Sequence, residues 1–210
     1  MIFNKLKKLD FFFLFVVTII SIIGFLALYS ASNGSFEPWA KKQILRFLIF
    51  FVLLIVIALI DIKFIYRHGY TIFFFCFLLL TTVEIAGSFG LGARRWIKIF
   101  GISIQPSELI KITIIIALSK YYHDLKFENI GKITNTIVPL IIILFPSIFV
   151  LIQPDLGTSI MILLLGLSIM FISGVRLWKF FFGFLIFLIS MPYLWNSIKP
   201  YQQKRVLSFL

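Results

Sequence analysis

Seven long apolar runs, separated by short polar segments, dominate this chain of 210 residues. They lie at 11–31, 44–60, 69–86, 108–122, 136–153, 157–174 and 180–196. A helix needs about 20 residues to cross the hydrocarbon of a bilayer. Helices are favoured over barrel strands, because the runs do not alternate apolar with polar residues. The pattern predicts an all-α, polytopic transmembrane bundle of about seven spans, forming a single domain over residues 1–210.

The composition supports a membrane protein and argues against several other classes. Hydrophobic residues make up 61% of the chain and charged residues 13%, against about 45–50% and about 25% in soluble domains. The net charge of +12 comes from short Lys and Arg clusters between the apolar runs, so we expect no nucleic-acid partner. Cys76 stands alone, and no metal-ligand spacing occurs. We therefore expect no cofactor, although a role for a divalent cation is left open.

The basic residues also bear on orientation. Lys5, Lys7 and Lys8 precede the first apolar run. Because cytoplasmic segments carry an excess of Lys and Arg and the first helix usually dominates, we expect a cytoplasmic N-terminus. The other cations divide almost evenly between the two sides, so this orientation leaves an unusually basic outer face. Anionic molecules on that side, membrane lipids among them, would account for it.

The segment 87–107 has the composition of a binding loop. Its glycines allow tight turns. Arg94 and Arg95 can bind phosphate through their forked guanidinium groups, and Lys98 adds a point charge. Trp96 supplies an amphipathic ring that stacks on sugars or lies among lipid headgroups. An interfacial anchor that holds anionic lipid is the alternative interpretation of the same residues.

Two charged residues fall at the start of the fourth run. Glu108 and Lys111 are three residues apart, on one face of a helix, and can form an ion pair. Charges at such depth tend to face a cavity or a partner, although a pair that merely allows both groups to be buried is equally compatible with the spacing. Ser107 is expected to be the N-cap of this helix.

A tight reversal is expected between the fifth and sixth runs, at 153–158. Pro154 and Gly157 are typical turn residues. Asp155 precedes the sixth run and can cap its helix. That structural role explains Asp155 without any catalytic part.

Three stretches together resemble the SEDS family (shape, elongation, division and sporulation proteins), and its RodA branch most of all. They are GARRWIKIFGISIQPSELIKI, the turn IQPDLGTS and the terminal PYQQKRVLSFL, in the order found in that family. The resemblance implies a peptidoglycan glycosyltransferase of the bacterial inner membrane. Such an enzyme polymerises lipid II into glycan strands during cell elongation, which maintains cell shape. It also implies a partner, a class B penicillin-binding protein that crosslinks the strands.

The resemblance also suggests residues for substrate binding. Arg94, Arg95 and Trp96 match the loop implicated in the family, Glu108 and Lys111 would line its central cavity, and Asp155 lies in the family's turn. Lys98 and Arg205 are further candidates, as cations that stabilise a departing pyrophosphate.

One family feature is missing from these residues. The family's proposed catalytic aspartate lies in a motif like HTDF, which does not occur here. We therefore expect an N-terminal part of a SEDS protein, with no catalytic residue of its own and no activity alone. A flippase or transporter of lipid-linked precursors, and a non-catalytic scaffold that binds the penicillin-binding protein, are the alternatives.

Overall fold

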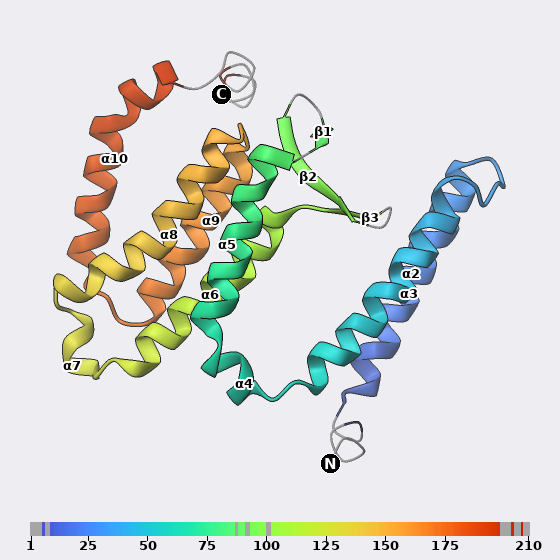
Figure 1. Cartoon of the computed structure of the whole chain (residues 1–210), viewed down its shortest axis with the longest axis horizontal. Helices are drawn as coiled ribbons and strands as arrows, with labels where there is room; N and C mark the ends of the chain where they lie inside the picture. Colours follow the sequence, from blue (N-terminus) through green and yellow to red (C-terminus); the bar gives the residue numbers. More distant parts are fainter. Residues whose placement is uncertain are drawn as a thin grey trace. The chain divides into compact units, whose positions relative to one another are not determined.

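The computed structural model describes residues 6, 9–86, 88–90, 93–99, 102–197, 203 and 207. Most of this part is helical (Figure 1). The helices are α2 (Phe11–Ala31), α3 (Trp39–Leu59), α4 (Ile62–Arg67), α5 (Gly69–Ala86), α6 (Pro106–Asp124), α7 (Phe127–Ile130), α8 (Thr134–Ile152), α9 (Leu156–Ile172) and α10 (Leu177–Ser197). Three short strands lie between α5 and α6: β1 (Ser88–Gly90), β2 (Ala93–Ile99) and β3 (Ile102–Ile104).

Each of the seven predicted apolar runs forms a helix, at α2, α3, α5, α6, α8, α9 and α10. Within the described residues, α2, α3 and α8 are long and apolar enough to cross a membrane, whereas α5, α9 and α10 contain shorter apolar stretches. The all-α class is confirmed, and a crossing by all seven helices stays a prediction. The fourth run was expected at 108–122, but its helix is longer because Pro106 can occupy the first helical position without losing a hydrogen bond.

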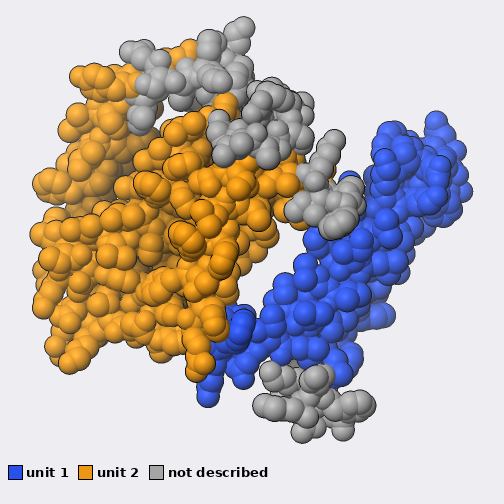
Figure 2. Space-filling model, in the orientation of Figure 1, with its two compact units in different colours: residues 1–65 blue, residues 66–210 orange. Residues whose placement is uncertain are grey.

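The chain divides into two compact units, Met1–Ile65 and Tyr66–Leu210 (Figure 2). This division describes packing within the chain, and the prediction of a single membrane domain stays a prediction. In the first unit α2 packs against α3, with the rings of Phe25 and Phe47 5.6 Å apart. Of the residues in these two helices, Ala40 is buried by protein and the apolar faces are largely exposed. An apolar solvent such as lipid is what such faces require.

The second unit has a packed core formed by α5, α6, α8 and α9. Its fully buried large side chains come from all four helices: Leu80, Val83, Ile110, Ile114, Leu118, Ile143, Val150 and Ile162. Helices α8 and α9 approach closely at Gly166, where a Cβ atom would lie 2.4 Å from Cγ1 of Ile143. The absence of a side chain at Gly166 is therefore a packing requirement.

Helix α8 contains two buried prolines, Pro139 and Pro146. A proline has no N–H, so the carbonyl four residues earlier loses its usual helical partner. For Pro139 that carbonyl belongs to Asn135, and the hydroxyl of Tyr121 on α6 donates to it at 3.2 Å. The proline thus creates a polar contact between α6 and α8 within an apolar core.

Candidate functional site

The segment expected as a glycine-rich binding loop forms a small antiparallel sheet in the order β1-β2-β3. Ser88 pairs with Trp96, but the neighbouring Phe89 pairs with Arg94, so one extra residue, Arg95, bulges from β2. On the other edge of β2, Lys98 pairs with Ser103. The strands were not predicted, because the glycines of this segment favoured a loop. The stretch WIKI within it is nevertheless rich in β-branched and aromatic residues, which favour a strand.

The sheet brings the predicted basic residues onto one strand. Arg94, Arg95 and Lys98 all lie on β2, and their side chains lie outside the described part of the structure. Trp96, between them in sequence, is 39% exposed. Strand β2 contacts both α5 and α6, so this short strand lies directly beside the start of α6.

The predicted ion pair at the start of α6 is confirmed. Nζ of Lys111 lies 2.8 Å from Oε1 of Glu108. The Lys111 side chain is 22% exposed and that of Glu108 57% exposed. Glu108 lies in the first turn, where the helix dipole favours a negative charge. The Lys111 side chain is therefore partly covered by protein, and a carboxylate lies beside its ammonium group.

The prediction of Ser107 as the N-cap of this helix was wrong. Helix α6 begins at Pro106, the N-cap is Gln105, and the Ser107 side chain is buried within the first turn. A proline at the first helical position moves the cap to the residue before it. Gln105 makes no capping hydrogen bond with its side chain, which reaches another element instead.

That element is the α8–α9 turn, where Asp155 accepts hydrogen bonds from two directions. Its Oδ1 accepts from the backbone N–H of Thr158 at 3.4 Å, so its predicted role as the N-cap of α9 is confirmed. Its Oδ2 accepts from Nε2 of Gln105 at 3.3 Å. Asp155 thereby links the start of α9 to the start of α6. Gly157, expected in the turn, lies in the first turn of α9.

A second glutamine ties the same turn to α5. Nε2 of the buried Gln153 donates to the backbone carbonyl of Leu80 at 3.1 Å. Neither glutamine was predicted as a site residue from the sequence, although each precedes a proline, at 105–106 and 153–154. That repeated Gln-Pro dipeptide was the available signal.

These contacts gather the described candidates at one end of the second unit, which we call the sheet end: the three strands, the end of α5, the start of α6 and the α8–α9 turn (Figure 1). Arg94, Arg95, Trp96, Lys98, Glu108, Lys111 and Asp155 belong to it by their backbone positions. Arg205, the remaining candidate, lies outside the described residues.

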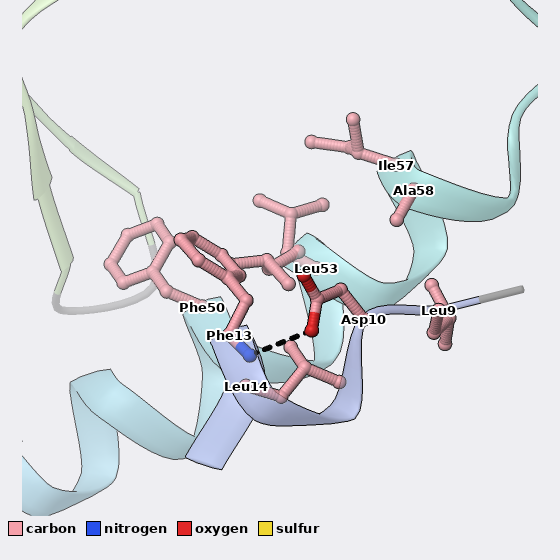
Figure 3. Close-up of a pocket in the computed structure, with 9 residues that line it drawn as sticks. Leu9, Asp10, Phe13, Leu14, Phe50, Leu53, Ile57 and Ala58 are labelled. Atoms are coloured by element: carbon pink, nitrogen blue, oxygen red, sulfur yellow. Dashed lines mark hydrogen bonds between the residues drawn. The ribbon is translucent and has the colours of Figure 1, made fainter. Parts of the chain in front are cut away.

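A separate groove of about 520 Å³ lies in the first unit, between the start of α2 and the later turns of α3 (Figure 3). Its walls are apolar apart from Asp10, whose carboxylate accepts from the backbone N–H of Phe13 at 3.0 Å (Figure 3). Asp10 therefore caps α2, and none of the predicted site residues lines this groove.

No metal site is expected from the sequence. Among the residues that the structure describes, no group of three or more His, Cys, Asp or Glu side chains is arranged to hold a metal ion. The expected lack of a cofactor stays a prediction.

Comparison with known proteins places the chain in a family. The family model FtsW/RodA/SpoVE, described as cell cycle protein, matches residues 9–210. The chain belongs to this family, and the resemblance to SEDS proteins is confirmed.

Named relatives come from several bacteria. The chain is 35% identical to the probable peptidoglycan glycosyltransferase FtsW of Wigglesworthia glossinidia brevipalpis, over 99% of this chain and 57% of the relative. It is 38% identical to the protein of the same name in Buchnera aphidicola strain Bp, over 81% of this chain and 45% of that relative. It is 29% identical to the peptidoglycan glycosyltransferase MrdB of Escherichia coli K12, over 96% and 54%. The chain thus spans about half the length of these curated relatives.

Solved structures support the fold. One chain, from a study of the structural coordination of polymerization and crosslinking by a peptidoglycan synthase complex, matches with a TM-score of 0.79 at 26% identity, over 95% of this chain and 58% of that one. The rod shape determining protein RodA of Thermus thermophilus matches with a TM-score of 0.73 at 23% identity, over 87% of this chain and 59% of that chain. The chain is therefore a membrane protein with part of the polytopic helical SEDS fold. Its assignment to the RodA branch stays a prediction, since relatives with both names match.

Proposed function

We propose that this chain forms the lipid-substrate-binding part of a peptidoglycan glycosyltransferase, which polymerises lipid II into glycan strands. The observation that carries the proposal is the 35% identity, over 99% of the chain, to a protein named as a probable enzyme of this kind. The predicted residues also lie together at the sheet end by their backbone positions, as residues of one binding site must. We place the protein in the bacterial inner membrane with its N-terminus in the cytoplasm, because Lys5, Lys7 and Lys8 precede the first span.

The proposed reaction explains why a basic strand is needed. The 4-hydroxyl of one sugar attacks the anomeric carbon of another and breaks the bond to a lipid-linked pyrophosphate. Negative charge accumulates on that pyrophosphate as it leaves, so fixed cations lower the barrier. Arg94, Arg95 and Lys98 on β2 are the residues we assign to this role, with Arg205 as a helper, and Trp96 offers a half-exposed ring to a sugar.

The remaining residues of the sheet end divide by their contacts. Lys111 on α6 is partly buried and paired with Glu108. The carboxylate offsets the charge of Lys111, which suits a cavity wall close to the cations of β2. Asp155 has protein partners on both carboxylate oxygens. These contacts favour a positioning role for Asp155, through Gln105 and the start of α6, over direct contact with substrate.

A similar solved structure also supports a protein partner. A chain of a peptidoglycan synthase complex, in a structure concerned with polymerization and crosslinking, shares this fold at a TM-score of 0.79. We propose that the protein acts with a crosslinking transpeptidase, a class B penicillin-binding protein, during cell elongation.

The test is a chimera in which residues 9–210 replace the matching stretch of the Wigglesworthia relative. We expect the chimera to polymerise lipid II, and its Arg94→Ala/Arg95→Ala variant to lose about 100-fold in rate, the usual effect of removing a group that stabilises developing charge. Lys42→Ala/Lys63→Ala, which removes two exposed cations from the first unit, is the matched control.

Two results would count against the proposal. Polymer formation that does not depend on the two arginines would remove the assigned role of β2. A chimera that inserts and folds but moves lipid II across a vesicle membrane without making polymer would favour the flippase.

A further inference from the structure

A second group of cations lies at the opposite end of the same unit, where α8 begins and α9 connects to α10 (Figure 1). Nζ of Lys179, in the first turn of α10, donates to the backbone carbonyl of Lys132 at 3.0 Å. The same amino group also donates to the hydroxyl of Thr136 on α8. Lys179 is thereby fixed beside the segment that carries Lys132.

Arg176 approaches the same segment. A Cβ atom at Gly131 would lie 2.9 Å from Nε of Arg176 and 3.5 Å from its Cζ. The guanidinium group therefore lies against the Gly131 backbone, one residue from Lys132. The side chains of two cations thus reach the dipeptide 131–132 from a later loop: Arg176 lies 45 residues after Gly131, and Lys179 lies 47 residues after Lys132. Lys132 itself is a third basic residue at this place. We call Lys132, Arg176 and Lys179 the basic triad.

No acid neutralises the basic triad among the described residues. The ion pairs found there are Glu37–Lys41 and Glu108–Lys111, both elsewhere. The first turns of α8 and α10 contain no acidic residue. Cations near the N-terminus of a helix are unfavourable, since the helix dipole is positive there. Lys132, Arg176 and Lys179 all lie at such ends, so an external anion would relieve a repulsion that the protein leaves in place.

The surroundings of the basic triad are those of a membrane interface. Helix α8, which is able to span a membrane, begins at Thr134, two residues after Lys132. Trp178 is 47% exposed, and Nζ of Lys179 lies 5.9 Å from its ring centre. Phe127 and Leu177 are 84% and 68% exposed. Tryptophan at a span end and exposed apolar side chains beside cations are typical of the headgroup region.

We propose that the basic triad binds the phosphate of an anionic phospholipid headgroup, with the acyl chains along the exposed apolar faces of α8 and α10. Arg176 and Lys132 are exposed and supply charge-assisted donors, and Lys179 adds a positive charge held against the Lys132 backbone. The adjoining apolar surface selects a lipid over a free phosphate ion. This site is separate from the sheet end and does not depend on the proposed glycosyltransferase activity.

The test is native mass spectrometry of the purified full chain in dodecyl maltoside micelles that contain phosphatidylglycerol or phosphatidylcholine. We expect selective retention of phosphatidylglycerol. Lys132→Gln/Arg176→Gln should weaken its binding about 25-fold, because each basic residue near an anionic surface contributes about fivefold. Neither side chain makes a hydrogen bond within the described residues, so folding should be retained, which circular dichroism checks.

Matched variants separate the alternatives. Lys132→Arg/Arg176→Lys, which keeps both charges, should bind like the unmodified chain, and Lys42→Gln/Lys63→Gln, which removes two exposed cations elsewhere, should too. Inorganic phosphate at millimolar concentration should not displace the lipid. Equal retention of the two lipids, full affinity in the neutral variant, an equal loss in the Lys42/Lys63 variant, or displacement by phosphate would each overturn the proposal.

Discussion

The two ends of the second unit use their charged groups in different ways. At the sheet end, Lys111 pairs with a carboxylate, and hydrogen bonds from Gln105 and Gln153 link the α8–α9 turn to α6 and α5. At the other end, cations contact backbone carbonyls and aromatic rings. Lys179 does so, and Lys120 donates to the carbonyl of Arg67 at 2.7 Å while its Nζ lies 4.8 Å from the centre of the Tyr70 ring.

This difference indicates that the sheet end is the more rigid of the two and that the two ends bind different ligands. Hydrogen bonds between buried polar side chains and other elements fix a geometry, which suits a site where reacting groups must be held. Cations that no carboxylate of the described residues pairs with suit, at a membrane interface, a headgroup that exchanges with the surrounding lipid. Both ends depend on the packed core between them.

The largest effect is expected from Gly166→Ala, at the crossing of α8 and α9. Its Cβ would overlap Ile143 at 2.4 Å, and overpacking of this kind costs about 1–3 kcal/mol. Gly183→Ala is the control, because nothing lies within 4 Å of a Cβ there and alanine favours a helix over glycine by about 1 kcal/mol. Denaturation in detergent should show a loss for the first and none for the second; equal behaviour would contradict the close crossing.

An intermediate effect is expected from Asp155→Ala, which breaks the link between the starts of α6 and α9 at the sheet end. The variant loses the N-cap of α9, worth about 1 kcal/mol, and the contact with Gln105. Asp155→Asn retains an oxygen that can accept from Thr158 and should lose less. A double-mutant cycle with Gln105→Ala should give a coupling of about 0.5–1 kcal/mol; additive effects would show that the two side chains act independently.

Gly131→Ala should change lipid binding at the basic triad without changing stability. The new methyl group would meet the flexible guanidinium of Arg176, which can move aside, so we expect the free energy of unfolding to change by less than about 0.5 kcal/mol. Phosphatidylglycerol affinity should nevertheless fall about fivefold, the contribution of one displaced cation. Unchanged lipid affinity in this variant would show that the position of Arg176 does not matter.

The smallest effect is expected at Glu37, whose pair with Lys41 is a solvent-exposed reference for the Glu108–Lys111 pair. The hydrogen bond from Lys41, at 2.5 Å, and its positive charge lower the pKa of Glu37 from its ordinary value. A lowered pKa stabilises the folded state at pH values above the ordinary pKa, and this stabilisation is lost as pH falls through the lowered value. Titration by NMR should show the low pKa, and Lys41→Met should return it towards normal; an unchanged value would exclude the pair in solution.

The sequence predicted well what depends on apolar surface and on short-range spacing. Run lengths predicted all seven long helices, and the i, i+3 spacing predicted the pair between Glu108 and Lys111. Asp155 was correctly expected as a cap, because a helix needs an acceptor at its first turn.

What the sequence did not predict depends on contacts between distant segments. The bond from Gln105 to Asp155 joins residues 50 positions apart, and that from Gln153 to Leu80 joins residues 73 apart. The sheet was missed because strand pairing across 88–104 is weakly signalled in a short glycine-rich stretch. The convergence of Arg176 on Gly131 likewise depends on how α8, α9 and α10 pack, which no local pattern encodes.

The most direct measurement is the binding of lipid II to the purified chain, compared across variants of the two ends. We expect Arg94→Ala/Arg95→Ala to weaken lipid II binding by more than tenfold, since two charge-assisted phosphate contacts are lost, and to leave phosphatidylglycerol binding unchanged. Lys132→Gln/Arg176→Gln should show the reverse. Lipid II binding that is unaffected by the two arginines of β2, or that is lost through the basic triad instead, would contradict the assignment of the sheet end as the substrate site.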